Sequence, residues 1–139
     1  MGNVVMQAPG LAIEHRPDGI TIYRIRNVRR ETADALYAAF AKADQEAFAE
    51  NFHSRTILDL RGAGWPTPYG VTRLIKSAEE TPIGLRESIA MLVSDAIAIQ
   101  LVALLLHRMP TRAQNSTRLF STEEEAIEWL EQRLLELGP

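Results

Sequence analysis

Histidine is the residue type in this chain best suited to metal or acid–base chemistry, and the sequence has three: His15, His53 and His107. None belongs to an HxxH or HExxH pair, so a metal ion would need ligands gathered from three separate elements. We expect His15 on or beside a strand end, His107 in the last turn of a helix, and His53 in a solvated loop. The spacing therefore predicts no metal site.

Motifs for covalent catalysis are also missing from the sequence. The chain has no cysteine and no GxSxG pentapeptide, although a serine–histidine–acid triad built from unlinked residues stays open. The acidic runs Glu79-Glu80 and 123–125 are expected to lie exposed at helix ends rather than to form a glycosidase pair. We therefore predict no catalytic residue, no enzyme activity and no cofactor.

The segment 60–64 contains two glycines and joins a predicted strand to a predicted helix, which is the context of phosphate-binding loops. It lacks both the GK[ST] lysine and the GxGxxG spacing, so we expect the glycines to allow a turn beside Trp65. Asp59 interrupts the apolar strand just before this loop. We expect its carboxylate to accept hydrogen bonds from the loop backbone or from Arg61, with a catalytic base as the alternative.

Periodicity along the chain alternates between strand and helix. We expect a loose lead-in over 1–10, a hairpin of strands at 11–15 and 20–25, further strands at 56–60, 89–93 and 117–120, and helices at 32–50, 67–80, 95–109 and from 121 onward. Ser94 or Asp95 can cap the third helix, and Ser121 with Glu124 or Thr122 with Glu125 can form a capping box on the last one.

The order ββαβαβαβα predicts an α/β fold: a single domain over 11–139 with a mixed five-stranded sheet and about four helices. The uninterrupted apolar run at 89–93 predicts a strand covered on both faces, so the later part of the sheet should be parallel.

Composition excludes several classes of protein. With 15 basic and 18 acidic residues the net charge is -3, which is not the basic footprint of a nucleic-acid-binding protein. The longest apolar stretch, 96–106, spans only about half of a bilayer core. The N-terminus has no secretory signal, so we expect a cytoplasmic protein without a membrane span.

The helix expected at 95–109 is apolar nearly all round, so one sheet surface cannot cover it. One face carries Ile97, Leu101, Leu104 and Leu105. A subunit contact, a neighbouring helix or a cavity for an apolar ligand could each cover this face. We predict a homodimer through these four residues, because a two-fold contact lets one patch cover itself.

The element order, the strand 57–60 with its following loop and helix, and the closing segment 118–130 resemble the SpoIIAA-like, or STAS, superfamily over residues 11–136. In the closing segment Arg118, Phe120, Ala126 and Trp129-Leu130 fit a pattern of bacterial SpoIIAA-like proteins. The resemblance implies a non-enzymatic regulatory domain that binds a protein partner. The similarity of this fold to Sec14-like domains implies the alternative, a carrier or sensor of a small apolar ligand.

Anti-sigma-factor antagonists of this superfamily carry a phosphorylated serine in an Asp-Ser-Ser-Gly sequence at the start of the helix after the third strand. At the matching spacing this chain has Thr67-Pro68-Tyr69-Gly70, in which only the glycine agrees. The resemblance therefore implies a binding surface here without the serine switch.

The loop 65–70 has two prolines and two aromatic residues, so it can present large side chains at little entropic cost. We expect Trp65, Thr67, Tyr69 and Gly70 to form the partner-binding site. The alternative is that Trp65 and Tyr69 cover the core. Free N–H groups at the start of the following helix could receive an acidic group of the partner.

Overall fold

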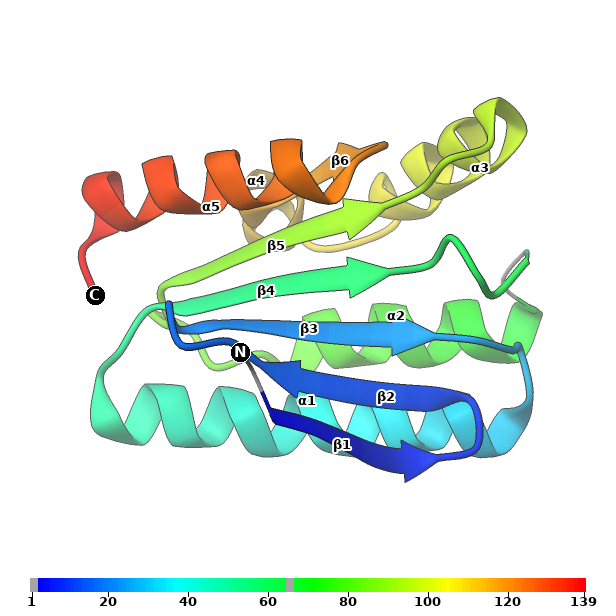
Figure 1. Ribbon diagram of the computed structural model, residues 1–139, viewed down its shortest axis with the longest axis horizontal. Coiled ribbons are helices and arrows are strands. Elements are labelled where there is room, and N and C mark those ends of the chain that lie inside the picture. Colours follow the sequence, from blue (N-terminus) through cyan, green and yellow to red (C-terminus); the bar gives the residue numbers. More distant parts are fainter. Residues whose placement is uncertain (1–2, 65–66) are drawn as a thin grey trace.

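The computed structural model describes residues 3–64 and 67–139, apart from the side chains of residues 6 and 7. Within these ranges it has one six-stranded sheet and five helices (Figure 1). The strands are β1 Asn3–Ala8, β2 Leu11–His15, β3 Ile20–Ile25, β4 Ser54–Asp59, β5 Glu87–Leu92 and β6 Thr117–Phe120. The helices are α1 Arg30–Glu50, α2 Pro68–Glu80, α3 Ala96–Leu106, α4 Thr111–Ser116 and α5 Glu123–Leu137.

The sheet is mixed, and its strands lie in the order in which they occur in the chain. β1, β2 and β3 are antiparallel neighbours, whereas β3, β4, β5 and β6 are parallel. Parallel neighbours require crossover connections, which α1, α2 and the α3–α4 pair supply. The α/β class and the parallel later half of the sheet are confirmed.

The two faces of the sheet bury different clusters, because side chains alternate along each strand. Tyr23, Leu58 and Met91 face α1 and α3, and the Tyr23 ring meets Phe40 of α1 edge to face at 4.6 Å between centroids. Their neighbours along the strands face the opposite way, where α5 covers them with Ala126 and Leu130. Figure 1 shows α1 and α5 on opposite sides of the sheet.

The lead-in predicted over residues 1–10 is wrong for residues 3–8, which form β1 and raise the strand number from five to six. Val4 and Val5 are 64% and 42% exposed, so backbone pairing with β2 holds this strand rather than burial. Hydrophobic periodicity cannot reveal such a strand.

The second difference lies after α3, which ends at Leu106 rather than near Met109. A separate six-residue helix, α4, follows Pro110 and leads into β6. Proline has no N–H to donate and begins a helix more readily than it continues one, which explains the break. The four predicted helices therefore become five among the described residues.

Predicted local signals mark the starts of α3 and α5 and the β2–β3 turn correctly, whereas α1 begins at Arg30 rather than at Thr32, without a side-chain cap. Asp95 caps α3 by accepting from the N–H groups of Ile97 and Ala98 at 2.8 and 3.2 Å. Thr122 caps α5 by accepting from Glu125 N at 3.3 Å, and its hydroxyl donates back to the Glu125 carboxylate at 2.8 Å. Gly19 closes the β2–β3 turn with φ 87°, a value that favours glycine.

The apolar face predicted on α3 is divided between core and surface. Leu105 is only 4% exposed and packs with Met109 and Ala113 beneath α2, so it belongs to the core and its assignment to an oligomer surface is wrong. Ile97 and Leu104 are 68% and 63% exposed. The helix has no charged residue to mark its outer side, which is why the sequence could not separate the two groups. Within the described ranges, no helix combines the length and apolarity that crossing a membrane needs.

Adjacent leucines on α3 provide a matched test of this packing. We expect Leu105→Ala to lower the free energy of unfolding by about 2–5 kcal/mol, because it leaves a cavity under α2. Leu104→Ala should change it by less than about 0.5 kcal/mol, since that side chain is exposed. Urea denaturation measures both. Equal losses would contradict the packing described here.

Candidate functional site

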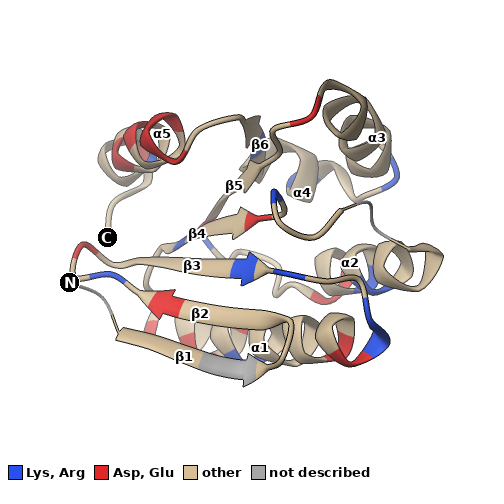
Figure 2. Cartoon of the chain, turned by 45° about the vertical axis from the view of Figure 1, so that its right-hand side comes forward, with Lys and Arg blue, Asp and Glu red and all other residues tan. Residues whose placement is uncertain are grey.

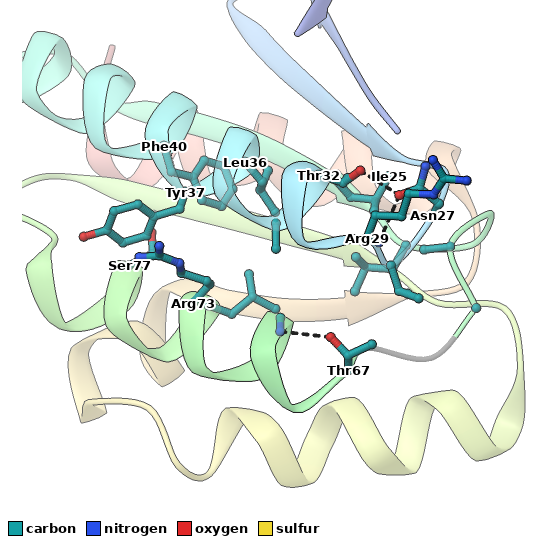
Figure 3. Close-up of a pocket in the computed structure, with 17 residues that line it drawn as sticks. Ile25, Asn27, Arg29, Thr32, Leu36, Tyr37, Phe40, Thr67, Arg73 and Ser77 are labelled. Carbon is teal, nitrogen blue, oxygen red and sulfur yellow. Dashed lines mark hydrogen bonds between the residues drawn. The ribbon is translucent and has the colours of Figure 1, made fainter. Parts of the chain in front are cut away.

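A groove opens between α1 and α2, next to the ends of β3 and β4 (Figure 3). Leu36 and Phe40 of α1 form one wall and Leu74 of α2 forms the other, while Leu60 and Ala63 come from the loop after β4. The spacing of four residues places Leu36 and Phe40 on one side of their helix. The described residues leave about 60 Å³ of free space in this largely apolar groove.

Polar and aromatic side chains form a network on the rim of the groove. The Tyr69 hydroxyl donates to the Asp34 carboxylate at 2.5 Å, and Arg73 Nε donates to the same oxygen at 3.0 Å. The Arg30 guanidinium lies 4.4 Å from the centroid of the Tyr69 ring, and that of Arg73 lies 4.9 Å from the centroid of Tyr37. These contacts join α1 to α2 and fix two half-buried tyrosines beside the groove.

Basic residues concentrate around this groove. The segments 26–37 and 67–76 that border it hold five of the 15 basic residues and two of the 18 acidic ones. The rest of the chain has 10 basic and 16 acidic residues, so the groove is a positive region on an acidic protein. Figure 2 shows basic positions along the connection from β3 to α1.

Thr67 is the N-cap of α2, and its hydroxyl oxygen accepts from Gly70 N at 3.1 Å. Pro68, the first residue of the helix, has no N–H group. Two of the first three helical positions therefore have no free N–H group to offer, and the expected capture of an acidic group by this helix end is not supported. The basic side chains on the rim are the better donors.

Of the predicted partner-binding residues, Thr67, Tyr69 and Gly70 lie together at the start of α2, beside the groove. Trp65 lies outside the described residues. The sequence analysis did not identify Arg73 and Asp34 as site residues. Arg73 follows Tyr69 by four residues, and Asp34 follows Arg30 by four, so each pair could have been expected on one helix face. Only the packing of α1 on α2 brings the two pairs together.

Asp59, at the end of β4, organises the loop that precedes α2. Its carboxylate accepts from the Arg61 backbone N at 3.1 Å, from Arg61 Nε at 3.0 Å and from Arg24 Nη1 at 2.9 Å. Burial alone would raise the pKa of Asp59, but the hydrogen bonds from Arg61 and Arg24 outweigh it and hold the pKa below its ordinary value. The prediction of a loop-organising carboxylate is confirmed.

Arg24 extends this network to two further elements. Its guanidinium lies 3.5 Å from the Glu14 carboxylate on β2 and 3.0 Å from that of Glu123, the first residue of α5. One arginine on β3 therefore ties β2, β4 and α5 together.

His53 is not the solvated loop residue that the sequence suggested. It is 5% exposed, its Nδ1 lies 3.0 Å from the carbonyl oxygen of Gly138, and its Nε2 lies 2.8 Å from Ser88 Oγ. Burial, with Arg55 and Arg133 nearby, holds the pKa of His53 below its ordinary value. No sequence motif links His53 to Ser88.

This serine–histidine pair is buried within the fold. Ser88 is fully buried and also accepts from Arg133 Nε at 2.9 Å, so its hydroxyl does not face a substrate. His15 is the last residue of β2, as predicted, and His107 is the C-cap residue directly after the last turn of α3. Across the described ranges, no three His, Cys, Asp or Glu residues are grouped so that they could hold a metal ion.

Comparison with known proteins supports the fold. No family model and no curated protein matches the sequence. The structure is similar to the crystal structure of an anti-sigma factor antagonist from Mycobacterium paratuberculosis, with a TM-score of 0.56 and 15% sequence identity. The match covers 91% of this chain and 99% of that one, so the chain has the SpoIIAA-like, or STAS, fold.

Removing the Asp59 charge tests its role in positioning the loop. We expect Asp59→Asn to lower the free energy of unfolding by about 1–3 kcal/mol at neutral pH, because Arg24 and Arg61 lose a charged acceptor. Since the pKa of Asp59 is lowered by folding, its contribution is present above the ordinary Asp value and is lost as pH falls below it. Urea denaturation at several pH values should show the two proteins converging in acid, and a difference independent of pH would contradict this account.

Proposed function

We propose that this protein is a non-enzymatic STAS-fold regulatory domain whose groove between α1 and α2 binds a protein partner. The observation that carries the proposal is an apolar groove bordered by fixed tyrosines and by an excess of basic side chains. Aromatic and arginine side chains around a desolvated centre are the usual composition of binding hot spots. The anti-sigma factor antagonist with a similar structure lends this role further support.

The groove fits an acidic protein segment that inserts one apolar side chain. Its free space of about 60 Å³ suits an anchor of that size, and the basic residues on the rim match acidic neighbours of the anchor. Tyr69 and Pro68 stand where the resemblance places the serine pair, so we propose that a serine phosphorylation switch is absent.

The alternative, a carrier of a small apolar ligand, is less well supported. Pockets for such ligands usually measure about 300–1,000 Å³, several times the space between the described walls of the groove. The net charge of -3 disfavours nucleic acid as a partner. We propose a cytoplasmic location for this regulatory domain.

We also propose a homodimer through the outer face of α3. Ile97 and Leu104 are mostly exposed on a helix without charged residues, and Leu101 between them is half-buried. A two-fold contact would cover these side chains with their own copies. Leu105 takes no part in it, because it is already buried.

The tyrosine on the rim tests the binding groove. We expect Tyr69→Ala to weaken partner binding by at least about 1 kcal/mol, or roughly fivefold, because it removes an anchored aromatic side chain. Immobilised protein would be used to capture the partner from an extract of its own cells, and the dissociation constant would then be measured. Leu135→Ala is the matched control, since Leu135 is 86% exposed on α5, across the sheet.

Unchanged affinity in Tyr69→Ala, or equal weakening by Leu135→Ala, would contradict the groove as the binding site. Circular dichroism must show that both variants stay folded. We expect this result, because Tyr69 lies on the rim and outside the buried core.

The dimer proposal is tested by light scattering after size exclusion. We expect about twice the 15.5 kDa chain mass at micromolar concentration. The double variant Ile97→Glu, Leu104→Glu should give the single chain mass, because it places charges in the contact. Leu135→Glu, an equally polar change on α5, should leave the dimer intact. A wild-type monomer throughout this concentration range would exclude the contact.

A further inference from the structure

Two carboxyl groups face each other inside the protein, one helical turn beyond the groove. Asp44 of α1 is 7% exposed, and Glu87 is the first residue of β5. Thr81, just after α2, donates to the Asp44 carboxylate at 3.4 Å. A buried carboxylate normally has a cation beside it, whereas in the described structure neither of these two takes part in an ion pair.

A cavity of about 120 Å³ lies beside Glu87, and Arg112 of α4 forms part of its wall. The Arg112 guanidinium donates to the carbonyl oxygens of Ala78, Glu79 and Thr81 at 3.3, 2.9 and 3.2 Å. These carbonyls belong to the last turn of α2 and to its C-cap residue Thr81, where the helix has no N–H partner for them. Arg112 therefore caps α2 from the edge of a cavity that also contains Glu87.

The carboxyl pair and the binding groove share walls. Phe40, Leu74 and Ser77 line both the groove and a smaller cavity of about 30 Å³ in which Asp44 and Glu87 lie. The pair joins α1 to β5, while Thr81 and Arg112 hold the end of α2 beside it. A movement of either helix at the carboxyl pair would therefore move side chains that shape the groove.

We propose that Asp44, Glu87 and Arg112 form a proton-operated latch that sets the spacing of α1 and α2 and thereby regulates the binding groove. This inference rests on the proposed function, since it assigns a regulation to the same groove. In the closed state one proton is shared by the two carboxyl groups, and Arg112 caps α2. When Glu87 releases its proton to solvent, two carboxylates repel each other, and the Arg112 guanidinium turns into the cavity to pair with Glu87.

Electrostatics at the pair agree with a shared proton near neutral pH. Burial, with the neighbouring Asp44 charge, raises the pKa of Glu87 to about 8, and burial raises that of Asp44 to about 6. Arg112 works against this shift by lowering the pKa of Glu87. The groups that interact with the pair are Tyr23 on β3, Thr81 after α2 and Arg112 on α4, and Glu46 on α1 acts on Tyr23.

The sign of the effect on stability follows from the raised pKa. The folded state holds a proton that the unfolded chain releases above the ordinary Glu value of 4.5. Stability should therefore fall as pH rises from that value to about 8, and it should level off above. Glu87 releases its proton, and the latch opens, as the pH approaches and passes about 8.

Amide chemical shifts of the intact protein, titrated from about pH 5.5 to 9.5, test the latch without a partner. We expect the amides of Arg73 and Ser77 on α2 to shift with one midpoint near 8, and the hydrogen-exchange protection factors in the last turn of α2 to fall across it. Glu87→Gln, which keeps the size of the protonated side chain, should abolish the midpoint. Glu50→Gln at the exposed end of α1 is the control and should leave it unchanged.

Two further variants isolate the parts of the latch. Asp44→Asn should lower the midpoint, because Glu87 loses the neighbouring negative charge. Arg112→Gln should leave exchange at the α2 end fast at every pH, because the cap is gone. If Glu87→Gln does not fold, the Asp44→Asn midpoint decides the question.

Groove amides that do not titrate, or that titrate equally in Glu87→Gln, would overturn the latch. That failure is distinct from failure of the proposed function. In that case Tyr69→Ala would still weaken partner binding roughly fivefold, whereas a wrong binding groove would leave the affinity unchanged with the latch titration intact.

Discussion

The carboxylate of Asp59 lies at the end of β4, where the chain leaves the sheet. The surrounding structure depends on how the negative charge of this carboxylate is paired. A charge that is nearly out of water must be paired, and Arg24 from β3 and Arg61 from the next loop supply the partners. Because Arg24 also reaches Glu123, the same requirement fixes the start of α5 on the other face of the sheet. The chain after Asp59 leads to α2, and the first turn of α2 borders the groove.

The α1–α2 pair has two polar ends with opposite electrostatic character. At the N-terminal ends of both helices, Arg30 and Arg73 surround Tyr69 and leave an excess of positive charge beside an apolar groove. Near the other end, the carboxyl groups of Asp44 and Glu87 lie together without an ion-pair partner among the described residues. A bound proton therefore neutralises one of the two charges. Phe40 and Leu74 line both the groove and the cavity beside the carboxyl pair, which is the physical basis for coupling partner binding to protonation.

Local signals in the sequence predicted most of the fold. The turn at Gly19, the caps at Asp95 and Thr122, and the pairing of Asp59 with Arg61 each depend on neighbouring residues. Features that depend on distant residues were missed: β1 is held by pairing with β2, and His53 is buried by Ser88 and the end of α5. Tyr69 was expected at the site from its own loop sequence. Asp34 and Arg73, which orient its side chain, were not expected, because Asp34 lies on a different helix, distant in the sequence.

Site-specific photo-crosslinking tests the central claim, that the groove between α1 and α2 receives the partner. A benzophenone amino acid at position 72, an exposed site on α2 between Tyr69 and Arg73, would be irradiated in extract from the native cell. The same amino acid at position 135 on α5 would report the opposite face of the sheet. We expect one protein adduct from position 72 and none from position 135. An adduct formed from position 135 and not from position 72 would place the binding surface elsewhere and contradict it.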